Sequence, residues 1–155
     1  MTDRFFQLLG DRLADLTKDL LFLHPPTGAL VSPQVIGVML DRPKTSTEGG
    51  AEYPYVRWLP YVGEFHCKAP TQFEVILDGG IYTSGNVADG NMDIHRLCMA
   101  LGKIAENPGF APYKLKDGVR FSIGIPDPEY RNPGIQPHPY YHCRLFLQFA
   151  GYHLD

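Results

Sequence analysis

The chain has 155 residues, of which 44% are hydrophobic and 20% are charged. This balance is typical of one globular domain and excludes disorder as the overall state. The formal net charge of -3 leaves no basic excess for a nucleic-acid backbone, so we expect no nucleic-acid specificity.

The sequence contains no recognisable membrane span, secretory signal or disulfide pattern. The apolar runs are far shorter than the ~20 residues that cross a bilayer, and the first residues lack the features of a secretory signal. We therefore expect no membrane association and synthesis in a cytoplasm. Cys67, Cys98 and Cys143 have no CxxC spacing, which favours free buried thiols over a disulfide framework or a zinc site.

The first third of the chain combines a helix, a short strand and a polar loop. Residues 3–21 predict an amphipathic helix, because an apolar stripe of helical period runs through Phe6, Leu9, Leu13, Leu16 and Leu20. Residues 35–40 are apolar and rich in β-branched side chains, which predicts a strand. Residues 42–52 contain no large apolar side chain, so we expect a long mobile loop.

Four segments are typical of β-strands. Residues 53–61 are aromatic but contain Pro54 and Pro60, which predicts a sheet edge or strand ends. Residues 73–81, 119–125 and 141–149 alternate, with apolar side chains at the odd positions, which indicates sheets with one covered face. The pair Gly79-Gly80 suggests a bulge or a bend in the first of these three strands.

The covering layer is predicted to include a second helix over residues 93–107, with Asp89 or Asn91 as its cap. Residues 126–139 contain five prolines and predict a stiff, extended arm. The expected fold is therefore α+β: a mostly antiparallel mixed sheet of about four strands, with two helices packed on one face, a long polar loop and a Pro-rich arm. Leu97, Leu101, Phe121, Ile123, Leu145 and Leu147 are its predicted core.

No catalytic signature is present in the sequence. Neither a nucleophile elbow nor a phosphate-binding glycine motif occurs, and the histidines and cysteines lack metal-ligand spacing. Glu74 and Asp78 share a strand face and could pair as acid and base, although solvated carboxylates are commoner. We therefore predict a protein that is not an enzyme, with no catalytic residue, no cofactor and no metal.

Three stretches resemble a known family. The sequence YPYV at 53–56, the stretch GGIYTSGNVADGNMDIHRLCMALGKI at 79–104 and HPYYHCRLFLQF at 138–149, after a leading helix, look like tail terminator proteins of long-tailed bacteriophages. The resemblance covers most of the chain, most clearly from about residue 50 onward. We therefore expect residues 1–155 to form a single tail-terminator-like domain. It implies a ring, usually a homohexamer, that caps the tail tube, stops tube polymerisation and offers a docking face to the head connector.

Within that resemblance the partners are other copies of the chain, the tail tube protein and a head-tail connector or neck protein. The protein would be assembled in the host cytoplasm and reside in the tail or neck of the virion. A ring interface must use surface that the helices leave free, and aromatic and arginine side chains tend to dominate buried contacts. The predicted subunit or tube interface therefore lies on the loop over 42–52, the aromatic edge and the Pro-rich arm, and comprises Arg42, Lys44, Glu48, Tyr55, Arg57, Trp58, Tyr130 and Arg131. Two alternatives remain: another neck or tail-completion ring protein, including one of a contractile tail or tailocin, and a small cytoplasmic enzyme using Cys67, Cys143 and nearby histidines.

Overall fold

The computed structural model describes residues 3–37, 50–64, 71–106, 114–115, 118–124 and 138–151. In chain order the elements are α1 (Asp3–Thr17), β1 (Phe22–Leu23), β2 (Leu30–Val31), β3 (Gln34–Ile36), β4 (Tyr55–Glu64), β5 (Thr71–Tyr82), α2 (Val87–Gly102), the 3-10 helix η1 (Lys103–Glu106), β6 (Lys114–Leu115), β7 (Arg120–Ile123) and β8 (Tyr140–Gly151). Within these ranges no helix has the length and apolarity needed to span a membrane.

The main sheet is mixed and mostly antiparallel, as predicted. β5 is its centre and pairs antiparallel with both β4 and β8. β3 pairs parallel with the start of β4 at one edge, while β6 and β7 each pair with part of β8 at the other. β1 and β2 form a separate antiparallel pair. The α+β class is confirmed, and the described sheet has six strands.

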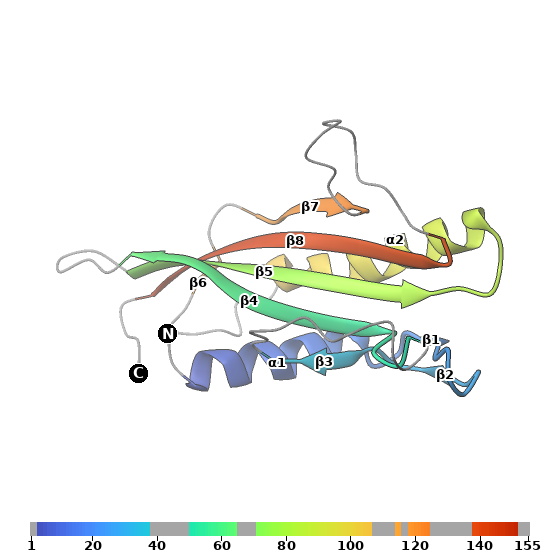
Figure 1. The fold of residues 1–155 in the computed structure, drawn as a ribbon. Coiled ribbons are helices and arrows are strands. Elements are labelled where there is room, and N and C mark those ends of the chain that lie inside the picture. The colour runs from blue at the N-terminus through green and yellow to red at the C-terminus, as the bar shows by residue number, and fades with distance from the viewer. Residues whose placement is uncertain are drawn as a thin grey trace.

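Both helices pack on one face of this sheet, which is also as predicted. Phe5 of α1 lies edge-on to Phe73 of β5 and Phe149 of β8, with ring centroids 4.8 and 5.0 Å apart. α2 packs against β5 and β8 and lies behind them in Figure 1. The odd positions of β5 and β8 therefore form the core with α1 and α2, and the even positions face the other way.

The buried stripe of α1 differs by one residue from the prediction. Its fully buried apolar side chains are Phe5, Leu9 and Leu13, whereas the predicted Phe6 and Leu16 pack only at the margin of the core. The helix also ends at Thr17, whose hydroxyl donates a hydrogen bond to the Leu13 carbonyl at 2.8 Å. The buried side chains of α1 are spaced by four residues. The sequence pattern alternated spacings of three and four residues, and therefore indicated a neighbouring face of the helix.

The start of α2 was also predicted too late. Asn86 is the cap: its side chain accepts from the Asp89 N–H at 2.9 Å, and the Asp89 carboxylate accepts from the Asn86 N–H at 3.2 Å. This reciprocal arrangement is a capping box. The first turn of α2 is exposed, so it carries none of the apolar periodicity on which the prediction over 93–107 depended.

Three further predictions need correction. The Gly79-Gly80 pair keeps regular register with both neighbouring strands, and the irregularity lies in β4 between Pro60 and Val62. Phe121 is 51% exposed, because β7 is a short strand at the rim of the sheet. The end of the expected loop is packed: Gly50 is buried, and the Ala51 carbonyl lies 3.1 Å from His24 Nε2.

Several predictions fall outside the described residues. These are most of the loop over 42–52, most of the Pro-rich arm over 126–139, the last part of the strand over 35–40 and residues 107–109, which were expected to end the second helix.

The strand predicted over 53–61 is β4. Its residues 55–57 lie between β3 and β5, and Pro60 stands at the irregularity, so the prolines mark a strand start and a break in the ladder.

Candidate functional site

A polar row crosses four strands on the sheet face that the helices leave free. Arg57 of β4 is the register partner of Asp78 in β5, Asp78 is the partner of Arg144 in β8, and Arg144 is the partner of Ser122 in β7. Residues that are directly opposite each other on adjacent strands share one face. The row therefore brings together side chains that lie up to 87 positions apart, from Arg57 to Arg144.

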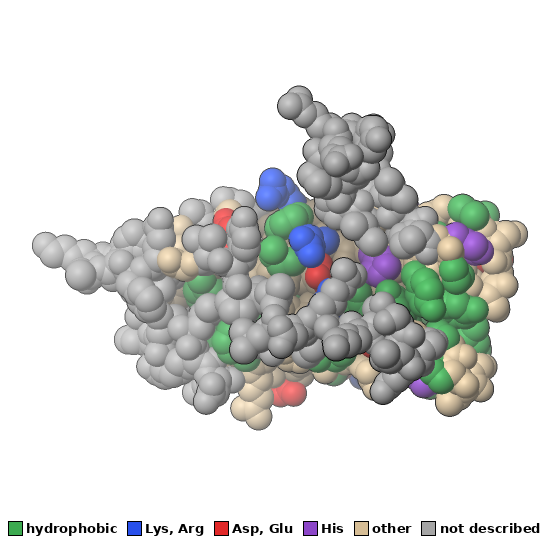
Figure 2. Space-filling view, viewed as in Figure 1, with side chains coloured by type: hydrophobic (Ala, Val, Ile, Leu, Met, Phe, Trp, Pro, Cys, Tyr) green, Lys and Arg blue, Asp and Glu red, His purple; other side chains and the backbone are tan. Residues whose placement is uncertain are grey.

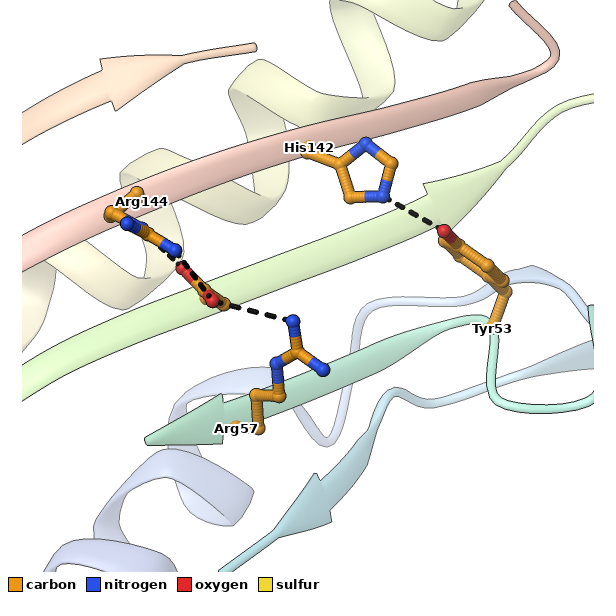
Figure 3. Close-up of polar contacts among 5 residues, drawn as sticks. Tyr53, Arg57, His142 and Arg144 are labelled. Carbon is orange, nitrogen blue, oxygen red and sulfur yellow. Dashed lines mark hydrogen bonds and ion pairs between the residues drawn. The ribbon is translucent and has the colours of Figure 1, made fainter. Parts of the chain in front are cut away.

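Asp78 is held between two arginines in this row (Figure 3). Arg144 donates from Nε to Asp78 Oδ1 at 2.7 Å and from a terminal nitrogen to Oδ2 at 3.1 Å, a bidentate geometry. Arg57 donates to Oδ2 at 3.4 Å. The side chains of Arg57 and Asp78 are only 11% and 12% exposed, whereas Arg144 is 36% exposed and reaches the surface.

The Arg57–Asp78–Arg144 triad retains one net positive charge, since a single carboxylate serves two guanidinium groups. The hydrogen bond to Asp78 raises the pKa of Arg144 above its already high usual value. The Arg57 guanidinium also lies 5.0 Å from the centre of the Tyr55 ring, a favourable cation–π contact. Among the described residues, the buried Nε of Arg57 has no hydrogen-bond partner.

Aromatic side chains surround the next row along the same face. The Tyr53 hydroxyl is 2.8 Å from His142 Nε2, and the Tyr53 ring lies 4.7 Å from that of Tyr140. This packing requires Gly80, because a Cβ there would lie 2.6 Å from Tyr55 Cζ and 2.9 Å from Tyr53 Cε1. The glycine thus lets the rings of Tyr53 and Tyr55 approach the β5 backbone closely beside the arginine triad.

This arrangement is suited to recognition of an anion. Arg144 is fixed by two hydrogen bonds and still exposes part of its guanidinium, so little side-chain freedom is lost when a carboxylate or phosphate binds it. Asp78 accepts from both arginines and does not face Glu74 as an acid–base partner. Glu74 instead accepts a hydrogen bond from Gln148 at 2.8 Å.

The structure tests the exposure of three predicted interface residues. Tyr55 is buried in the described chain, and Arg57 is committed to Asp78. Trp58 is 5% exposed and belongs to the hydrophobic core, where a Cβ at Gly10 of α1 would lie 3.0 Å from its ring. Trp58 points toward the helices and is therefore part of the core, so replacing it would disturb the fold as well as any contact of this edge.

The other predicted interface residues, Arg42, Lys44, Glu48, Tyr130 and Arg131, lie outside the described residues. Sequence reasoning missed Arg144, His142 and Tyr53 as members of one cluster. For His142 and Arg144 the signal was the placement of charged and hydrogen-bonding side chains at even positions of a strongly alternating strand, whereas Tyr53 precedes β4 and carried no such signal. Only the register of β4, β5, β7 and β8 shows which of them meet.

The cysteine chemistry is that of structural thiols in the described part of the chain. Cys98 of α2 and Cys143 of β8 are free, buried and hydrogen-bonded to each other. That hydrogen bond and burial raise the pKa of Cys143 well above its usual value, which keeps it a poor nucleophile. The same hydrogen bond lowers the pKa of Cys98, but Cys98 is only 1% exposed, so burial shields this thiol from reagents. Cys67 lies outside the described residues, and within them no three His, Cys, Asp or Glu side chains could hold a metal.

Comparisons with known proteins add no assignment to this geometry. No family model matches the chain, and no curated protein matches it. The function proposed next accordingly rests on the three residue stretches at 53–56, 79–104 and 138–149 and on where the fold places them.

Proposed function

We propose that this chain is a structural subunit of a long-tailed bacteriophage, which forms a ring on the tail tube, stops tube polymerisation and offers a docking face to the head connector. The observation that carries the proposal is the spatial arrangement of the three stretches that resemble tail terminator proteins. They come from distant parts of the sequence and form one packed unit in the fold.

The contacts within that unit are direct. Tyr53, at the start of the first stretch, contacts both Tyr140 and His142 of the third. The second stretch contains the end of β5 and all of α2. It packs on β8, within the third stretch, through the Cys98–Cys143 pair and through Gly90, which lies against Tyr141. A likeness that covers a contiguous framework supports a shared architecture better than the same number of scattered residues would.

The surface opposite the helices suits an assembly role. It carries the ordered Arg144 and the half-buried Tyr82 and Tyr140, and arginine and tyrosine are side chains enriched at the energetic centres of protein interfaces. In this proposal the partners are other copies of the chain in a ring, usually six, together with the tail tube protein and a head-tail connector or neck protein. The protein then resides in the virion after assembly in the host cytoplasm.

Tube-length control tests the proposal. The cognate tube protein is polymerised on its tail initiator complex with and without the purified chain, and tube lengths are measured by electron microscopy. An unrelated acidic protein of similar mass is the control. We expect tubes of uniform length with a ring at one end when the chain is present, and overlong tubes without it or with the control.

Unchanged tube length and no ring at the tube end would contradict the proposal. Rings that bind the purified head connector but not the tube end would instead identify another neck or tail-completion ring protein. The same assay with tube proteins of contractile tails or tailocins separates those assemblies from a non-contractile tail.

A further inference from the structure

Exposed cations gather on the sheet face away from the helices. Arg120 of β7 is exposed, and its guanidinium lies 5.0 Å from the centre of the Phe146 ring. Because Arg120 pairs in register with Phe146, it stands next to Arg144 on this face. Figure 2 shows Lys and Arg side chains gathered over β7 and β8, beside Asp or Glu and His side chains. We call Arg120 and Arg144 the arginine pair.

The arginine pair is held in place before any partner binds. Asp78 fixes Arg144 through two hydrogen bonds, and the Phe146 ring supports Arg120. Such support lowers the entropy lost on binding, which is why ordered arginines are effective partners for carboxylates. A pair of fixed guanidinium groups on a sheet face therefore selects acidic side chains of a second protein surface.

Acidic side chains occur on the opposite side of the subunit. α1 covers the other face of the sheet and exposes Asp11 and Asp15, and Asp19 is exposed in the turn that follows the helix. Asp11 and Asp15 lie four residues apart, about 6 Å along the helix and about 40° around it, so they share one side of α1. Asp15 already pairs with Arg12 at 3.2 Å and Lys18 at 3.1 Å. Asp11 and Asp19 have no ion pair within the described part of the chain.

The charge balance of the chain favours a second copy as the partner. On β4, β5, β7 and β8, the described charged side chains of the sheet face are three arginines, Glu74 and Asp78, which together carry +1. Because the whole chain carries -3, all other residues together carry -4. On the α1 side, Asp11, Asp15 and Asp19 outnumber Arg12 and Lys18 and leave a net charge of -1 over residues 11–19. A copy that presents this surface to the sheet face brings opposite charge to it.

We propose that subunits associate head to tail, with Arg120 and Arg144 of one copy bound to Asp11 of α1 and Asp19 of the turn after α1 in the next. The two surfaces lie on opposite sides of the subunit, so one contact repeats from copy to copy, and such a heterologous interface closes into a ring when the rotation allows it. This inference rests on the ring proposed above and names the surfaces that build it.

Charge reversal of the full chain tests the interface, with self-association measured by sedimentation velocity. The matched control for Arg120→Glu is Arg96→Glu on α2, because Arg96 is also exposed and its guanidinium lies 5.2 Å from the centre of an aromatic ring, that of Phe22. We expect Arg120→Glu to weaken association at least about tenfold, as like charges then meet, while Arg96→Glu leaves it unchanged. Raising sodium chloride from about 0.05 to about 1 M should weaken the wild type, because the Debye length falls to about 3 Å at 1 M.

The acidic side is tested by rescue. Asp11→Lys combined with Asp19→Lys should weaken association as Arg120→Glu does. Joining all three substitutions in one chain should recover it in part, because the side chain at 120 then meets a lysine while Arg144 still faces a like charge. Thermal melts establish that each variant is folded. Association that is indifferent to all these changes and to salt overturns this inference and leaves the ring proposal standing. A wild-type chain that stays monomeric both in solution and with tubes overturns both.

Discussion

Replacing Gly90 with alanine should destabilise the protein, although alanine is the better helix former. Gly90 lies in the first turns of α2, where alanine gains about 1 kcal/mol over glycine in an open helix. Here a Cβ would lie 2.7 Å from Cδ2 of Tyr141, well inside the ~3.5 to 4.0 Å of a normal carbon–carbon contact. The ring cannot retreat easily, because Tyr141 is fully buried and its hydroxyl lies 2.7 Å from His138 Nδ1.

The magnitude follows from these two opposed effects. Overpacking a core by one methyl group costs about 1 to 3 kcal/mol, and the close approach to Tyr141 places this case in the upper part of that range, at about 2 to 3 kcal/mol. Subtracting the helix gain of about 1 kcal/mol leaves a net loss of about 1 to 2 kcal/mol. For a chain of this length that corresponds to a melting temperature lower by about 2 to 8 °C. Gly102→Ala near the end of the same helix is the control, since nothing described lies within 4 Å of a Cβ built there.

Urea denaturation with circular dichroism measures both variants. We expect Gly102→Ala to be neutral or stabilising by up to about 1 kcal/mol, and Gly90→Ala to be less stable than the wild type. If the two substitutions change the free energy of unfolding equally, Tyr141 does not press on α2 and the reasoning fails.

Three further outcomes are expected. Asp78→Asn should cost about 1 to 3 kcal/mol in urea melts, because it leaves two guanidinium groups without their shared carboxylate in a largely buried site. Asp15→Asn also loses two cationic partners, but at an exposed position, and should change stability far less. Similar losses of stability in the two variants would contradict this prediction. Leu101→Ala should cost about 2 to 5 kcal/mol, since Leu101 is fully buried between α2 and the sheet, and a loss below about half a kilocalorie would remove it from the core. In a Cys67→Ser background, Cys98 and Cys143 should resist iodoacetamide until the protein unfolds, and rapid labelling of the folded protein would instead favour the enzyme alternative.

The predictions for Trp58 and Phe121 were wrong for the same reason: the sequence does not show which layer covers each side chain. Trp58 was assigned to an exposed edge because its neighbours are aromatic and proline-rich. In β4 the side chains alternate between faces, so Trp58 points toward α1 while Arg57 points away. The composition of a segment does not reveal which face each side chain takes, because that depends on which layer covers the strand. The exposed Phe121 reflects the same dependence at the rim of the sheet, where no neighbouring layer completes its burial.

The sequence by itself determined the fold class, the central strands and the two helices. Strict alternation over 73–81 and 141–149 specifies half-buried strands, and helical periodicity specifies the layer that covers them, because both patterns express local geometry. What only the tertiary structure decided is the meeting of Arg57, Asp78 and Arg144. Their contact depends on the pairing register of strands far apart in the chain, and a shift of one residue would place each of them on the opposite face.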